Sequence, residues 1–196
     1  MDELRALLEL LSMLVTDPRT GVLLLLLAAA AVSDYRTFRI PNLLTGGGIL
    51  FALVYNTLVA PAMHADWTWA PAGMLLGFGA MLPMYALRIM GAGDVKLMAM
   101  VGAFLGAAAT VTALLFCVVT AGVAALAWSA HHRLMGPMLA NVHTIIAGMW
   151  WSSIASGQPR LQPEHGRPPS VGKLAYGVSI AVGTAIYLVA NQLNFV

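Results

Sequence analysis

Two aspartates are the residues of this sequence that could carry out chemistry. Asp94 ends the string GAGD that begins at Gly91, and it lies between two stretches with almost no charge. Asp34 directly follows the apolar run 21–33. An acidic side chain at membrane depth costs about 2.5–3.5 kcal/mol on insertion scales, so such a group needs a partner or a function. Each of these aspartates is the best candidate partner for the other.

A pair of carboxylates in a partly dehydrated site does not readily carry two negative charges. Mutual repulsion raises the pKa of one member, so that the pair holds a single shared proton near neutral pH. Aspartic proteolysis needs this state, because the ionised member takes a proton from a water molecule while the protonated member polarises the scissile carbonyl. The chemistry needs no metal and no other cofactor. We therefore predict that Asp34 and Asp94 form a catalytic pair.

The residues around Asp94 fit the same chemistry. Gly91 and Gly93 permit positive φ, and without side chains they would let an extended substrate backbone come close to Asp94. We predict that these two glycines form a substrate-approach loop. Lys96 belongs to the same short segment and has no assigned role.

Structural roles stay open as alternatives for these residues. Asp94 could N-cap the helix that follows it, with Lys96 as an anchor that reaches toward the polar boundary. Asp34 could offset the charge of the arginines that follow it in the sequence. Apart from Glu164, these two aspartates are the only acidic residues on the side that is predicted below to be cytoplasmic. Neither alternative explains why both of them lie at membrane level.

The composition predicts a membrane protein. Of the 196 residues, 60% are hydrophobic and 9% are charged, whereas a water-soluble domain usually carries about 25% charged residues. The single cysteine, Cys117, excludes an internal disulfide framework and a CxxC-type zinc module. We predict a single all-α polytopic membrane domain over residues 1–196, with the lipid bilayer and no nucleic acid among its partners.

Apolar runs and turn signals divide this domain into about six transmembrane helices. The first starts at Pro18, a residue type favoured at the first helical position. Residues 95–130 would be about 54 Å long as a single helix, nearly twice the thickness of a bilayer core, so we predict two short spans with a turn near 106–110. In the third span Gly73 and Gly77 are four residues apart, a spacing that lets helices pack closely. The remaining predicted spans are residues 43–63, 71–90 and 174–193.

Two further segments are predicted to lie in the membrane interface. Residues 1–16 place leucines at helical spacing opposite charged residues, which indicates an amphipathic surface helix. Its acidic start argues against the alternative, a cleavable signal peptide. Residues 137–156 are uncharged but rich in Ser and Trp. A Pro/Gly-rich stretch, 157–173, is predicted to follow as a cytoplasmic loop.

The distribution of positive charge decides between two topologies. If 137–156 lies in the interface without crossing, eight of the ten Lys and Arg residues face the cytoplasm; if it crosses, the split is five and five. We therefore predict an interfacial helix at 137–156 and both termini outside. The first span includes Asp34, and two spans then separate it from Asp94. Because an even number of crossings returns the chain to the same face, both aspartates are expected at the cytoplasmic boundary, at similar depth.

Three segments of the chain form a recognisable set of motifs: SDYRTFRIPN at 33–42, GAGDVKLMAMVGAFLG at 91–106 and, less distinctively, KLAYGVSIAVG at 173–183. Together they resemble the type IV prepilin peptidases, which share a GxGD-type aspartic machinery with the archaeal preflagellin peptidases. The resemblance implies that Asp34 and Asp94 are the catalytic pair and that Gly91 and Gly93 are the loop glycines. It includes Lys96 in the motif without a role.

The same resemblance implies an activity and a location. The protein would be a membrane aspartic endopeptidase that cuts the short basic leader from a prepilin or pseudopilin, beside a glycine and ahead of a hydrophobic helix. It would lie in the bacterial inner membrane with its active site facing the cytoplasm. Bifunctional members carry a cytoplasmic segment with paired CxxC cysteines and also methylate the new N-terminus. This chain has no such segment, so it resembles the short members that serve Flp (tight-adherence) pili, and N-methylation is not expected.

Two other classes of function stay open. A proton-coupled transporter or channel would use the aspartates as a relay and would place them at different depths. A non-catalytic subunit of pilus assembly would not need either aspartate.

Overall fold

The computed structural model describes residues 18–59, 67–86, 89–132, 136, 175–193 and 195, without the side chains of 58 and 59. The chain forms two compact units: one comprises the residues up to 121 together with those from 175 onward, and the other comprises 122–174. The predicted interfacial helices at 1–16 and 137–156 and the predicted loop at 157–173 lie outside the described residues. The described elements are all helical, in the order α2 (Pro18–Thr37), α3 (Asn42–Val54), a π-helical turn (Tyr55–Val59), α4 (Trp69–Ala86), α5 (Ala92–Leu105), α6 (Ala107–His131) and α8 (Tyr176–Gln192).

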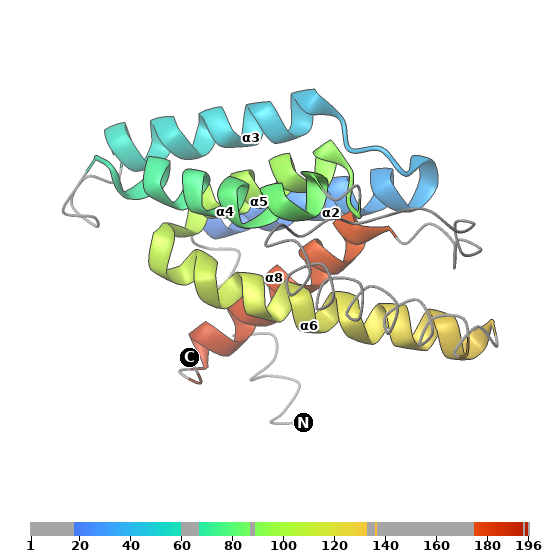
Figure 1. Ribbon diagram of the computed structural model, residues 1–196. Helices are drawn as coiled ribbons and strands as arrows, with labels where there is room; N and C mark the ends of the chain where they lie inside the picture. Colours follow the sequence, from blue (N-terminus) through green and yellow to red (C-terminus); the bar gives the residue numbers. More distant parts are fainter. Residues whose placement is uncertain are drawn as a thin grey trace, which may run out of the picture. The chain divides into compact units, whose positions relative to one another are not determined.

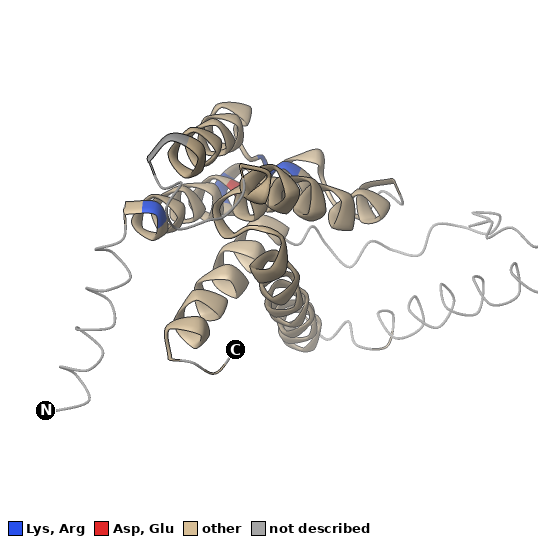
Figure 2. Cartoon of the chain, turned by 90° about the vertical axis from the view of Figure 1, so that its left-hand side faces the viewer, with Lys and Arg blue, Asp and Glu red and all other residues tan. Residues whose placement is uncertain are grey.

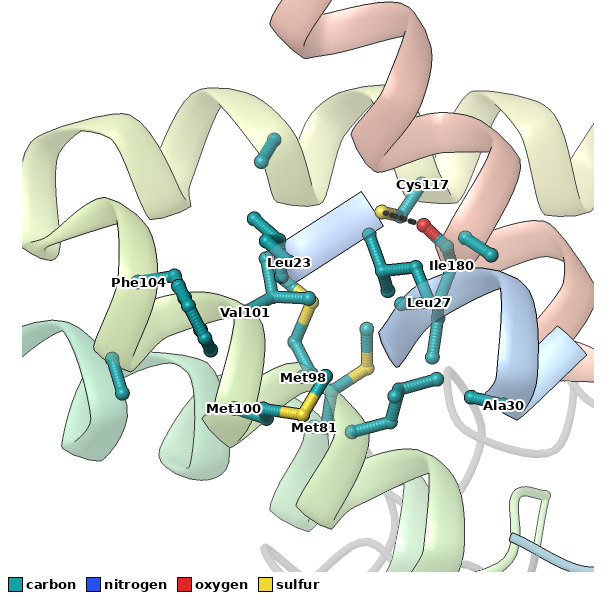
Figure 3. Close-up of a cluster of buried hydrophobic side chains, with 14 of the residues drawn as sticks. Leu23, Leu27, Ala30, Met81, Met98, Met100, Val101, Phe104, Cys117 and Ile180 are labelled. Atoms are coloured by element: carbon teal, nitrogen blue, oxygen red, sulfur yellow. Dashed lines mark hydrogen bonds between the residues drawn. The ribbon is translucent and has the colours of Figure 1, made fainter. Parts of the chain in front are cut away.

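The central element of the first unit is α5, and α2, α3, α4 and α8 all contact it (Figure 1). Ten of its fourteen residues are buried. A helix that is apolar all round has no face to offer to water, so neighbouring helices cover it. Figure 3 shows Met98, Met100 and Val101 of α5 packed with Leu23 and Leu27 of α2 in the hydrophobic core.

Helices α4 and α5 meet backbone to backbone. A Cβ atom on Gly73 would collide with the carbonyl oxygen of Gly102, and one on Gly102 would collide with the carbonyl oxygen of Gly73. One turn further along α4, a Cβ on Gly77 would collide with the carbonyl oxygen of Met98. The close packing predicted from the spacing of Gly73 and Gly77 is therefore confirmed.

Most helix boundaries follow the sequence signals. Helix α2 begins at Pro18, as predicted, and includes Asp34. The predicted break in 95–130 is confirmed at Gly106, whose φ of 77° lies in the left-handed region that suits glycine. Among the described helices, α2 and α6 are long and apolar enough to cross a membrane. The count of six spans stays a prediction.

The turn that connects α2 to α3 is held by several hydrogen bonds and carries Ile40, a residue of the candidate site. Phe38 closes the end of α2 with a φ of 50°, and its N–H donates to the Asp34 carbonyl oxygen at 2.8 Å. The Ser33 hydroxyl donates to the Arg39 carbonyl oxygen at 2.8 Å. Pro41 then starts α3 from an extended conformation. These bonds fix the path of the backbone on both sides of the buried residue Ile40.

Candidate active site

Asp34 lies in the last turn of α2 and is buried, with 6% of its surface exposed. Its carboxylate oxygen Oδ2 accepts a hydrogen bond from the backbone N–H of Gly177 at 2.7 Å. Gly177 is the second residue of α8 and follows Asp34 by 143 positions in the sequence. The last described helix therefore reaches back to the end of the first.

Asp94 is the third residue of α5 and is 7% exposed. Its Oδ2 accepts a hydrogen bond from the backbone N–H of Gly91 at 3.1 Å. The N-cap residue of α5 is Gly91, not Asp94. Asp94 is therefore not the N-cap residue itself, but from the third helical position its carboxylate accepts the N–H of the N-cap residue in a capping box, so Asp94 has a structural capping role whatever its chemistry.

The structure brings the two aspartates together around Ile40. A Cβ on Gly93, next to Asp94, would lie 3.2 Å from Cβ of Ile40, and a Cβ on Gly177 would lie 3.0 Å from its Cδ1. The charge of Asp34 acts on the carboxyl of Asp94. These are the only two acidic residues in the described part of the chain, and Figure 2 shows how few charged residues these helices carry.

Asp34 does not pair with a neighbouring arginine. Arg36 and Arg39 are both exposed, and within the described residues no ion pair links either of them to Asp34. The partner of the Asp34 carboxylate is a backbone amide of α8. The alternative that Asp34 offsets an arginine charge is therefore wrong.

The protonation of Asp94 follows from its surroundings. This residue lies outside both candidate membrane spans and ahead of the predicted span that begins at residue 95. Burial raises the pKa of Asp94 to about 6; the Gly91 N–H lowers it, and the negative charge of Asp34 raises it. The carboxyl group of Asp94 is therefore mostly protonated below a pH of about 6, and in that range it can donate a hydrogen bond.

We expect kcat/KM for cleavage to decrease as the pH rises above the pKa of Asp94. A pair that needs one proton becomes fully ionised once the pH passes the pKa of Asp94, about 6, so kcat/KM should fall about tenfold for each further pH unit. The measurement is kcat/KM from pH 4.5 to 8.5 with the purified protein. A rate that stays constant from pH 6 to 8.5 would contradict a proton on Asp94 as the working state.

The two glycines of the predicted approach loop differ from each other. Among the described residues Gly106 is the one glycine with positive φ, so neither Gly91 nor Gly93 adopts the positive φ that glycine permits. Gly93 is helical, and its missing side chain makes room for Ile40. Gly91 is exposed, and a Cβ there would meet Asp94 Oδ2 at an ordinary contact distance of 3.4 Å. The open space beside Asp94 therefore lies at Gly91.

Lys96 connects two helix starts. Its Nζ donates to Oδ1 of Asn42, the first residue of α3, at 2.9 Å, and its side chain is exposed. Because Asn42 ends the turn that carries Ile40, this bond links the turn after α2 to the first turn of α5. The sequence left the role of Lys96 unassigned; the structure gives it a position that ties the two aspartate-bearing segments together.

Two residues of the site were not singled out by sequence reasoning. Gly177 lies in the segment 173–183 that resembles a family motif, but no residue of that segment was predicted to act in the site. Ile40 lies in the segment 33–42 that also resembles a family motif, but no role was predicted for it. The available signal for Gly177 was that it is a glycine in the first turn of an apolar helix. Such glycines are too common for this signal alone to assign a role in the site.

A helical protein that buries two interacting carboxylates fits the class of aspartic hydrolases that work at the membrane. The chain belongs to the type IV leader peptidase family: the model of that family matches residues 21–126, more than half of the sequence. No curated protein and no solved structure matches the chain significantly. The family match includes α2 to α5 with both aspartates, and it ends before α8.

Proposed function

We propose that this protein is a metal-independent aspartic endopeptidase that removes the leader from prepilin-like substrates, with Asp34 and Asp94 as its catalytic pair. Membership of the leader peptidase family supports the activity. The observation that carries the residue assignment is that two carboxylates on different helices are both buried and that the segments carrying them both pack at Ile40. No other acidic side chain of the described residues is available for the same role.

The pair can complete hydrolysis by itself. The ionised carboxylate takes a proton from a water molecule as the water oxygen adds to the scissile carbonyl carbon, while the protonated carboxyl donates to the carbonyl oxygen. The carbon–nitrogen bond then breaks as the leaving nitrogen takes up a proton from the protonated member. At the same time the ionised member takes a proton from a hydroxyl group of the tetrahedral diol, which re-forms a carbonyl. The leader leaves with a new carboxyl group and the pilin with a new amino group. The pair returns to its single proton.

The substrate follows from where the site would lie. With six spans and both termini outside, the two aspartates lie at the cytoplasmic boundary of the bacterial inner membrane. A prepilin or pseudopilin presents its basic leader and the adjacent glycine at that boundary, with its hydrophobic helix in the bilayer. The exposed Gly91 leaves space beside Asp94 for an extended backbone. By its resemblance to the short GxGD members, the protein would serve Flp-type pili without methylating the product.

The direct test is cleavage by the purified protein in detergent micelles. A synthetic prepilin with a basic leader, a glycine and a hydrophobic helix should be cut once, beside the glycine, as read by mass spectrometry. The rate should not change after treatment with a metal chelator. The same helix without its leader serves as the control and should stay intact. Absence of any cut would overturn the proposal, and a chelator-sensitive rate that returns with added metal would overturn its mechanism.

A further inference from the structure

We propose that Gly177 is a positioning residue for Asp34, so that the first turn of α8 is a necessary part of the catalytic site. The inference rests on the proposed function for its catalytic meaning, but the contact itself can be tested without activity. Gly177 makes no contact that would identify it as a catalytic group. Its backbone N–H acts through the Asp34 carboxylate.

The contact is short and buried on both sides. The Gly177 N–H donates to Asp34 Oδ2 at 2.7 Å, and both residues are buried. The N–H of Val178, the next residue, donates instead to the Ala175 carbonyl oxygen at 3.2 Å. The first N–H groups of an α-helix have no partner within the helix. A carboxylate is a favourable partner there, because it meets the positive end of the helix dipole.

The contact also requires glycine at position 177. A Cβ there would lie 2.8 Å from Asp34 Oδ2, 3.1 Å from Asp34 Cβ and 3.0 Å from Ile40 Cδ1. Any side chain would therefore push the Asp34 carboxylate away while leaving the peptide N–H in place. The same close approach that makes the hydrogen bond short leaves no room for a Cβ unless the side chain of Asp34 or Ile40 moves.

The first turn of α8 also lies near the segment that carries the second aspartate. A Cβ on Gly177 would lie 3.0 Å from Cδ1 of Ile40, and a Cβ on Gly93, next to Asp94, would lie 3.2 Å from Cβ of the same Ile40. The segments that carry the two aspartates, at the end of α2 and the start of α5, therefore both lie close to one turn of a third helix. A catalytic carboxylate must be held within about 0.5 Å of its working geometry, and the N–H of Gly177 supplies that constraint for one oxygen of Asp34.

Gly177→Ala tests the inference, with Gly183→Ala as the matched control. Gly183 lies on the same helix and is also buried, and a Cβ there would lie 2.6 Å from Cα of Cys117 on α6. Both substitutions therefore strain the packing of α8, but only the first displaces Asp34. We expect Gly177→Ala to lower kcat about 100-fold with KM within about twofold, the loss typical of a displacement of about 1 Å. Gly183→Ala should keep kcat per folded molecule.

A thermal double-mutant cycle tests the contact independently of activity. Gly177→Ala should lower the Tm by about 5 °C in the wild-type background, and by much less in an Asp34→Ala background, where Oδ2 is absent. Gly183→Ala should lower the Tm equally in both backgrounds. The cycle also covers the case in which Gly177→Ala alone does not fold, because Asp34→Ala should then restore folding.

Two outcomes would overturn the inference. One is a wild-type kcat for folded Gly177→Ala, or an equal loss of kcat in both alanine variants. The other is the same Tm loss from Gly177→Ala with and without the Asp34 carboxylate. If the wild-type protein cuts no prepilin, the proposed function fails, and the thermal cycle still decides whether Gly177 holds Asp34.

Discussion

Asp34→Asn and Asp94→Asn are each expected to reduce leader cleavage by at least about 10³-fold, which is within the range for loss of a general acid or base. Asparagine has nearly the same shape as aspartate and keeps a carbonyl oxygen that can accept the N–H of Gly177 or Gly91. It cannot take a proton from water, and it cannot hold the shared proton of the pair. The chemistry should therefore be lost while the fold and membrane insertion remain.

The measurement is the initial rate of prepilin cleavage by each purified variant, together with its yield in the membrane fraction and its Tm. Asp66→Asn is the matched control, because in the sequence Asp66 falls between the second and third predicted spans and is therefore expected on the face opposite to the predicted site. This control should cleave at the wild-type rate. Cleavage at the wild-type rate by either Asp34→Asn or Asp94→Asn would refute the pair and favour a relay or an assembly role.

Gly73→Ala and Gly102→Ala are expected to have the largest effect on stability, each lowering the free energy of unfolding by about 3 kcal/mol. A Cβ at either position would collide with the carbonyl oxygen of the other glycine. Backbone atoms of two packed helices cannot turn aside as a long side chain can, so α4 and α5 would have to separate. Because α5 carries Asp94 and most of its residues lie in the hydrophobic core, separating α4 from α5 should also lower the amount of active protein.

Gly79→Ala, which lies on α4 like Gly73→Ala, is the control for these two variants. A Cβ at Gly79 would have no atom within 4 Å, so alanine there should be neutral or slightly stabilising through its higher helix propensity. Thermal unfolding of the purified proteins in one detergent gives the comparison. Equal Tm values for Gly73→Ala and Gly79→Ala would show that α4 and α5 do not pack as closely as the structure has them.

Local sequence signals predicted much of this protein because they act over a few residues. Pro18 starts α2 because its ring fixes φ at a helical value. Gly106 ends α5 because the chain there needs positive φ. The four-residue spacing of Gly73 and Gly77 repeats on one face of a helix, so it predicted a close helix contact without identifying the partner helix. Hydropathy and crossing parity also predict that both aspartates lie at one membrane boundary, and this stays a prediction.

The residues that complete the site could not be predicted in the same way. Gly177 bonds an aspartate 143 residues earlier in the chain, and Lys96 bonds Asn42, 54 residues earlier. Neither contact belongs to a helical period or a turn pattern, so no window of the sequence contains it. The sequence also suggested free space at both loop glycines, whereas the packing of Ile40 occupies the space beside Gly93.

By itself, then, the sequence determined that the chain is helical and apolar, where most helices begin and end, and which two carboxylates could act together. These properties depend on hydrophobicity and backbone preference, which each residue carries wherever it is placed. The tertiary structure decided that α5 is the central helix, that Ile40 separates Gly93 from Gly177, and that α8 supplies the N–H that holds Asp34. Such contacts arise only when distant helices pack, because the shape of each surface selects its partner.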